Sequence, residues 1–162
     1  MVIISNHQGN FDIPVLVAIL PFSPAFIAKD ELTRIPLIST WMKALDCLPI
    51  NRKNPRLARE KISERMKVKG KNPIVLFPEG TRSRGKHTGN LRAGSLKLIF
   101  QNKMKVLPVT IMGTYKAFEE KKVIQPAIVT VTFHPLVRTS DYPRQDFPKF
   151  LEDIRNIITI YH

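Results

Sequence analysis

The octapeptide SNHQGNFD, residues 5–12, joins two apolar segments near the start of the chain. Residues 2–6 predict a strand, and residues 12–20 predict a buried helix that Asp12 can cap. His7 would then end a strand and Asp12 would begin a helix, so the short loop can fold the carboxylate back onto the imidazole. An aspartate bonded to one ring nitrogen leaves the other nitrogen available as a general base. The alternative interpretation is a surface loop with a capping aspartate.

Beyond this loop, apolar patterning predicts strands that alternate with helices. Further strands are expected at residues 26–28, 47–51, 73–77, 106–112 and 127–133. Further helices are expected at residues 35–45, 56–69, 94–101 and 147–161. The alternating side chains of residues 127–133 suit an antiparallel or edge strand, and the single apolar stripe of the last helix predicts packing on a sheet. The expected fold is α/β: one domain over residues 1–162, with a mixed, partly parallel sheet flanked by helices.

Basic residues outnumber acidic ones, with 26 Lys and Arg against 13 Asp and Glu, for a net charge of +13. Residues 51–71 hold nine basic and two acidic residues, and residues 82–105 hold seven basic and no acidic residues. This distribution predicts an anionic partner, such as an anionic membrane surface or a phosphorylated ligand. Nucleic acid is a competing partner. It is not expected, because no recognised motif is present and aromatic residues are not interleaved with the basic clusters.

A second stretch with candidate functional side chains is FPEGTRS, residues 77–83, which follows a predicted apolar strand. Ligand sites in α/β sheets form at the carboxyl ends of strands. Arg82 offers a planar fork for a phosphate, Thr81 adds a hydroxyl, and Gly80 permits a close backbone approach. Glu79 suits accepting a hydrogen bond from a substrate hydroxyl or orienting an arginine. A turn with exposed charges is the alternative interpretation.

Patterns for several other chemistries are missing. The chain has no Gly-x-Ser-x-Gly elbow, no Walker loop, no paired-glycine dinucleotide fingerprint and no His-Glu-x-x-His. The other histidines have no ligand-like spacing to His7, so we expect no metal site. Cys47 is the only cysteine, which excludes an intrachain disulfide and favours an intracellular setting. Its apolar surroundings predict a packing role. The longest uncharged run, residues 13–28, is too short and too rich in proline for an ordinary membrane-spanning helix.

Taken together, these segments resemble the glycerolipid acyltransferases, and specifically the PlsC-like 1-acylglycerol-3-phosphate acyltransferases. Residues 6–12 resemble the family's His-x4-Asp motif, and residues 77–83 match its third motif in full. Residues 47–52 and 106–109 resemble the second and fourth motifs, and residues 29–32 resemble its Lys-x-Glu-Leu segment. The segments follow the family's order. The second motif departs from the family by having cysteine where glycine is usual.

The resemblance implies acyl transfer from a thioester to the sn-2 hydroxyl of 1-acyl-sn-glycerol-3-phosphate, which gives phosphatidic acid. By the same resemblance, His7 would remove the proton of the attacking hydroxyl and Asp12 would orient His7. No covalent acyl-enzyme is needed in such a direct transfer. Backbone N–H groups near Gly9 or Gly80 are the candidate donors to the oxyanion.

The resemblance also implies the binding residues for the acceptor. Arg52 and the Glu79-Gly80-Thr81-Arg82 loop would hold its phosphate and glycerol, with Arg82 on the phosphate and Glu79 on glycerol hydroxyls. The co-substrate would be acyl-CoA or an acyl carrier protein thioester, and no further cofactor is implied. Alternatives are an acyltransferase for glycerol 3-phosphate or another lysophospholipid, and a non-catalytic module that binds anionic lipid.

Family members usually carry N-terminal helices that bind or enter the membrane, whereas only six residues precede His7 here. We therefore expect this chain to lack the N-terminal membrane-binding segment. The implied location is the cytoplasmic face of a membrane, with the protein peripheral or anchored by a segment absent from this chain.

Overall fold

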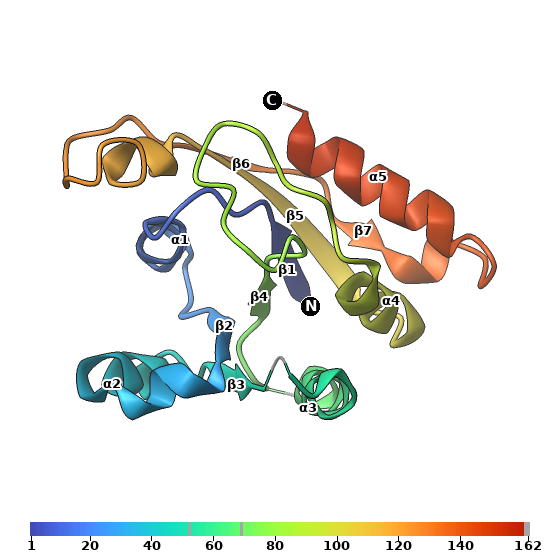
Figure 1. Ribbon diagram of the computed structural model, residues 1–162. Coiled ribbons are helices and arrows are strands. Elements are labelled where there is room, and N and C mark those ends of the chain that lie inside the picture. Colours follow the sequence, from blue (N-terminus) through green and yellow to red (C-terminus); the bar gives the residue numbers. More distant parts are fainter. Residues whose placement is uncertain (52, 69, 161–162) are drawn as a thin grey trace.

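The computed structural model describes residues 1–51, 53–68 and 70–160, in which strands and helices alternate (Figure 1). The strands are β1 (Val2–Ser5), β2 (Ala25–Lys29), β3 (Leu48–Ile50), β4 (Ile74–Leu76), β5 (Lys105–Met112), β6 (Thr130–Phe133) and β7 (Val137–Arg138). The α-helices are α1 (Asp12–Ile19), α2 (Pro36–Ala44), α3 (Pro55–Lys67), α4 (Ala93–Gln101) and α5 (Phe147–Thr159). Short 3-10 helices are η1 (Asp30–Arg34), η2 (Thr114–Ala117) and η3 (Thr139–Asp141).

The strands form one sheet in which β3, β2, β4, β1 and β5 lie side by side and run parallel. β1 lies between β4 and β5, with Ile3 opposite Val75 on one side and Leu107 on the other. β6 and β7 pair antiparallel with β5. The expected α/β class with a mixed, partly parallel sheet is confirmed, and most of its strands are parallel. The expected antiparallel strand is also present, but it begins at Thr130 rather than at residue 127.

Helices cover both faces of this sheet (Figure 1). Side chains alternate along a strand, so Val2 and Ile4 enter one apolar cluster and Ile3 enters the other. The cluster around Ile3 includes Leu16 of α1. The opposite cluster is built with α3, α4 and α5. The buried strands therefore have continuous apolar sequences, as expected for a sheet covered on both faces.

Helix α5 packs as its stripe predicts. Phe150, Ile154 and Ile158 are all fully buried in the cluster that includes Val106 of β5. The expected packing of this helix on the sheet is confirmed. Tyr161, the last expected member of the stripe, lies outside the described residues.

The start of α1 differs from the expectation. Asp12 is the first helical residue, Phe11 occupies the N-cap position, and no side chain caps the helix. The prediction that Asp12 caps α1 is therefore wrong. Its carboxylate instead contacts His7 Nδ1 and Gly9 N of the preceding loop and the hydroxyl of Thr114.

Parallel strands place their carboxyl ends at one edge of a sheet. Residues 6–11 follow β1, η1 follows β2, residues 77–92 follow β4, and Gly113 with η2 follows β5. The long loop between β4 and α4 arches over this edge (Figure 1). In the described part of the chain, no helix combines the length and the apolar character needed to cross a membrane.

Candidate active site

His7 and Asp12 form a direct pair at the end of β1. His7 Nδ1 lies 2.6 Å from Asp12 Oδ2, so the loop folds back as the sequence predicts. Asp12 is fully buried, while the His7 side chain is 16% exposed. With Nδ1 donating to the carboxylate, Nε2 is the basic nitrogen of the ring. The pair thus has the arrangement that general-base chemistry needs: an oriented imidazole that a substrate can reach.

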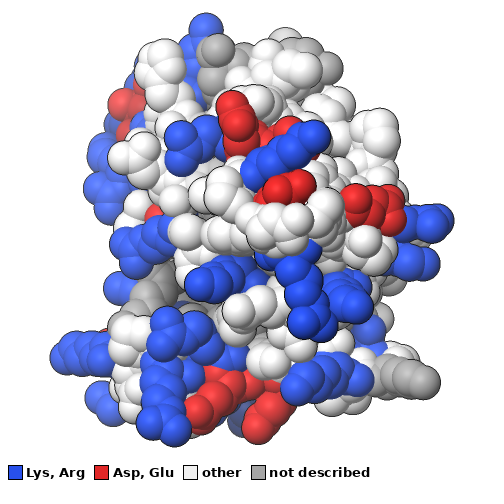
Figure 2. Space-filling view, turned by 90° about the vertical axis from the view of Figure 1, so that its right-hand side faces the viewer, with Lys and Arg blue, Asp and Glu red and all other residues white. Residues whose placement is uncertain are grey.

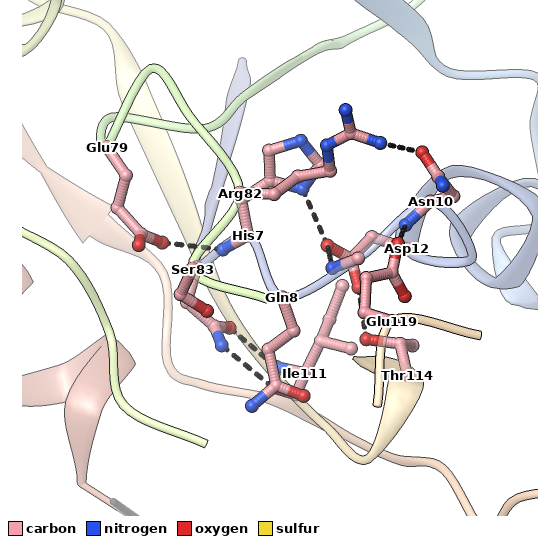
Figure 3. A network of polar contacts seen from close by, with 12 residues as sticks. His7, Gln8, Asn10, Asp12, Glu79, Arg82, Ser83, Ile111, Thr114 and Glu119 are labelled. Carbon is pink, nitrogen blue, oxygen red and sulfur yellow. Dashed lines mark hydrogen bonds and ion pairs between the residues drawn. The ribbon is translucent and has the colours of Figure 1, made fainter. Parts of the chain in front are cut away.

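Asp12 is itself held by further donors. Oδ2 also accepts a hydrogen bond from Gly9 N at 2.9 Å, and Oδ1 accepts one from the Thr114 hydroxyl in η2 (Figure 3). Thr114 is fully buried and directly follows Gly113, the first residue after β5. Sequence reasoning does not anticipate it, because an isolated threonine 102 positions from its partner leaves no local signal.

The His7 ring is also held by Phe77. The two rings stack with centroids 4.1 Å apart and planes inclined by 15°. Phe77 is the first residue after β4, the strand next to β1. This contact fixes the plane of the imidazole, while Asp12 fixes its direction within that plane.

The residues on either side of His7 anchor the loop. The Asn6 side chain exchanges two hydrogen bonds with the backbone of Ile111, at 2.8 Å and 2.7 Å, and so extends the pairing of β1 with β5. Gln8 Oε1 accepts from Gly113 N at 2.8 Å, and its Nε2 donates to Lys86 O at 3.3 Å. Both side chains are buried, so the positions flanking His7 serve as framework.

Glu79 also binds this framework. It is 4% exposed, and its two oxygens accept hydrogen bonds from His7 N and Gly89 N, each at 2.6 Å (Figure 3 shows the first). Burial raises the pKa of Glu79, and the two backbone hydrogen bonds oppose that rise. In this structure the carboxylate ties the His7 backbone to the loop between β4 and α4. Contact with a substrate hydroxyl stays a prediction.

Arg82 lies next to the His7 loop. Ser83 N donates to His7 O at 2.8 Å, and Arg84 N donates to Gln8 O at 3.0 Å, so the chain around Arg82 pairs with the residues after β1. The exposed guanidinium donates through Nη1 to Asn10 Oδ1 (Figure 3). A planar cation beside an oriented imidazole suits an acceptor that carries a phosphate.

The remaining predicted binding residues are Gly80, Thr81 and Arg52. Gly80 has φ of +70°, and a Cβ there would lie 2.9 Å from Arg92 Nε, so this turn requires glycine. Thr81 is exposed beside Arg82. Arg52 lies outside the described residues. The structure therefore brings Glu79, Gly80, Thr81 and Arg82 to the His7 loop.

The amides expected near the oxyanion already have partners within the chain. Gly9 N donates to Asp12 Oδ2, and Gly80 N donates to Phe77 O at 3.1 Å. An oxyanion site at either glycine stays a prediction.

The second-motif segment and the Lys-x-Glu-Leu segment meet at the ends of β2 and β3. A cleft of about 400 Å³ lies there, and the residues that line it include Asp30, Glu31, Arg34, Asn51 and Lys53.

Cys47 lies just before β3 and packs against the cluster around Ile3. Burial raises the pKa of its thiol, which agrees with the predicted packing role. Within residues 1–51, 53–68 and 70–160, no group of three or more His, Cys, Asp or Glu side chains is suited to a metal ion.

Comparison with known proteins agrees with this geometry. The family model described as Acyltransferase matches residues 1–112, which include the His7–Asp12 loop, the Arg82 loop and β5. The chain belongs to this acyltransferase family. The 1-acyl-sn-glycerol-3-phosphate acyltransferase of Cocos nucifera is 29% identical over 93% of this chain and 50% of its own length. A probable enzyme of the same name from Mycoplasma genitalium is 30% identical over 98% of this chain and 64% of its own length.

The acyltransferase fold is also seen in a solved structure. The crystal structure of the 1-acyl-sn-glycerophosphate acyltransferase PlsC from Thermotoga maritima matches with a TM-score of 0.74 and 26% identity. That match covers 98% of this chain and 64% of the other. The expected PlsC-like fold is confirmed, and this acyltransferase chain spans from about half to somewhat under two thirds of the length of these relatives.

Proposed function

We propose that this acyltransferase moves a fatty acyl group from acyl-CoA or acyl carrier protein to the sn-2 hydroxyl of 1-acyl-sn-glycerol-3-phosphate. The product is phosphatidic acid. The observation that carries the chemistry is the partly exposed His7 ring, held through Nδ1 by the buried Asp12 at 2.6 Å. The names of the relatives from Cocos nucifera and Mycoplasma genitalium support this choice of acceptor.

The chemistry follows from the pair. His7 Nε2 takes the proton of the acceptor hydroxyl as its oxygen bonds to the thioester carbonyl carbon. Asp12 stabilises the resulting imidazolium. When the tetrahedral intermediate collapses, the carbon–sulfur bond breaks and the proton passes from His7 to the leaving thiolate. The step needs neither a covalent acyl-enzyme nor a further cofactor.

Arg82 would bind the acceptor phosphate. From its position beside the His7 loop, Arg82 would hold the phosphate close to the base, and such positioning would lower the barrier. Thr81 and Arg52 would add donors to the phosphate, and Gly80 would let the acceptor approach the backbone. Glu79 would contact glycerol hydroxyls with the lone pairs that its backbone partners leave available.

An anionic membrane surface is the partner that the charge supports. Figure 2 shows Lys and Arg side chains spread over much of one face of the molecule, with acidic side chains grouped among them. Each cation close to an anionic bilayer contributes about 1 kcal/mol to binding. We therefore place the acyltransferase at the cytoplasmic face of a membrane, and we expect no nucleic-acid partner.

The test is a thiol-release assay with acyl-CoA and 1-acyl-sn-glycerol-3-phosphate. Wild type should release thiol only when the acceptor is present, and His7→Ala should lower the rate by about 10³-fold or more. His87→Ala is the matched control, because His87 is an exposed histidine of the nearby loop. Equal rates for wild type and His7→Ala would remove His7 from the chemistry.

The same assay with a panel of acceptors addresses the alternative acceptors. Faster turnover with glycerol 3-phosphate or with another lysophospholipid would replace the proposed acceptor. Parallel reactions with acyl carrier protein thioesters identify the donor.

A further inference from the structure

Glu119 lies outside every recognised motif and packs against the middle of the His7–Asp12 loop. It follows η2 by two positions and is 7% exposed. Its Oε1 accepts a hydrogen bond from Asn10 N at 2.7 Å, across 109 positions of sequence (Figure 3). The carboxylate thus holds the backbone at a loop residue whose own side chain is exposed.

Gly9 makes this contact possible. A Cβ at Gly9 would lie 2.8 Å from Glu119 Cδ and closer still to Oε2. That spacing is too short for two carbon atoms, so any larger residue would push the carboxylate away. Glycine at position 9 and glutamate at position 119 therefore fit each other.

The side chain of Asn10 contacts Arg82, the candidate ligand of the phosphate. The backbone N–H of Asn10 donates to Glu119, whereas its side-chain Oδ1 accepts from Arg82 Nη1. Glu119 and Arg82 are thus joined through one residue of the loop that carries His7 and Asp12.

Glu119 Oε2 is buried and has no hydrogen-bond partner among the described residues. A buried oxygen left unpaired costs stability. The position of the Glu119 carboxylate therefore calls for an explanation beyond stability, and its hydrogen bond to the loop that carries His7 offers one.

We propose that Glu119 is a positioning residue for the acceptor. By fixing Asn10 it fixes Arg82, and it so sets the spacing between the group that binds the phosphate and the imidazole that takes the hydroxyl proton. This proposal rests on the proposed function, because it requires an acceptor that carries both a phosphate and a free hydroxyl.

Kinetics of Glu119→Ala and Glu119→Gln test the role. Loss of the Asn10 contact in Glu119→Ala should raise the KM for the acceptor about tenfold, the effect of losing a charge-assisted hydrogen bond. The KM for acyl-CoA and the pH profile of kcat should not change, because His7 and Asp12 keep their contacts. Arg82→Ala should raise the same KM.

Glu119→Gln should keep the acceptor KM within about threefold of wild type, because its amide oxygen can still accept from Asn10 N. Glu120→Ala is the matched control, since Glu120 is the exposed neighbour. An unchanged acceptor KM in Glu119→Ala overturns the proposal. Equal losses in the Ala and Gln variants overturn it as well.

A second measurement needs no turnover. Gly9→Ala should lower Tm in the wild-type background and should do so much less in the Glu119→Ala background, because the clash is then removed. In the wild-type protein, the Asn10 amide should also exchange its hydrogen slowly although the residue is exposed. Equal Tm losses in both backgrounds, or fast exchange at Asn10, overturn the contact and with it the proposal.

These measurements separate the two ideas. A wild-type protein that turns over no acceptor rejects the proposed function and, with it, the acceptor role of Glu119, even if the Gly9–Glu119 coupling is present. An active protein without the coupling rejects only the positioning role.

Discussion

Asp12 accepts hydrogen bonds from His7, from the loop at Gly9, and from Thr114 beyond β5. Its three donors come from the segments that follow two different strands, β1 and β5. The orientation of His7 therefore depends on the docking of β5 against β1 as well as on the short loop. Phe77 adds a ring contact from the other neighbouring strand.

Asp12→Asn should lower kcat by about 10³- to 10⁴-fold, because the amide no longer holds the imidazole in the productive tautomer or stabilises its charged form. The thiol-release assay measures this, with circular dichroism to show that the fold is kept. Asp141→Asn is the control, because Asp141 is an exposed aspartate in η3. A loss smaller than tenfold in Asp12→Asn would contradict the orienting role.

Glu79 predicts a pH dependence of stability. Burial raises its pKa above the usual value of 4.5, against the backbone hydrogen bonds that lower it. A carboxyl group with a higher pKa in the folded chain takes up a proton on folding. The free energy of unfolding contributed by Glu79 therefore increases as pH falls from the folded pKa to the unfolded pKa, and it is constant below that window.

Urea unfolding of wild type and Glu79→Gln between about pH 4 and about pH 8 measures this contribution. The free energy of unfolding of wild type minus that of Glu79→Gln should increase as the pH is lowered. A difference that decreases toward low pH would show that the hydrogen bonds from His7 and Gly89 outweigh burial.

Elements in this protein are positioned in two ways. Helix α5 is positioned by apolar packing, with Phe150, Ile154 and Ile158 fully buried. The loop between β4 and α4 is positioned by polar contacts, through Glu79 to His7 and through Ser83 to the same residue. Apolar packing stabilises the fold, whereas polar contacts and the stacked Phe77 ring set the geometry of the site.

Ile154→Ala should lower the free energy of unfolding by about 2–5 kcal/mol, because it removes a fully buried side chain and leaves a cavity. Ile160→Ala is the matched control. Ile160 is 63% exposed at the end of the same helix, and its loss should change stability by less than about 0.5 kcal/mol. Urea unfolding followed by circular dichroism compares the two, and equal effects would contradict the packing of α5.

The chain as a whole carries a net charge of +13. Figure 2 shows Lys and Arg side chains over much of one face of the molecule. This charge can therefore act on a large anionic surface as well as on one bound phosphate. A bilayer that contains anionic lipid is such a surface.

Binding to vesicles that contain phosphatidic acid should weaken steeply as salt rises from about 0.05 M to about 0.5 M, because exposed charges are screened. Co-sedimentation measures this, with vesicles of phosphatidylcholine alone as the control. Binding that ignores salt would contradict an electrostatic contact. Tighter binding to duplex DNA than to the anionic vesicles would favour the nucleic-acid alternative.

Much of the fold is predictable from local sequence. The alternation of strands and helices, the stripe of α5 and the antiparallel strand near residue 130 all follow from apolar periodicity, which is a property of neighbouring residues. β7 and the short 3-10 helices are not predicted, because β7 has only two residues and the 3-10 helices contain no continuous apolar run.

The contacts of the candidate site also divide into those that local sequence predicts and those that it does not. The contact of His7 with Asp12 joins residues five positions apart, so spacing and residue type suggest it, and the family resemblance favours it over a surface loop. The contacts of Glu79, Asn6 and Glu119 with the loop span 72, 105 and 109 positions, and no local pattern marks them. Local sequence was enough for the elements, the charge and the contact between His7 and Asp12, because these depend on side chains close together along the chain. Tertiary structure alone decided which strands lie beside β1, and so which carboxylates, amides and rings hold the His7 loop in place.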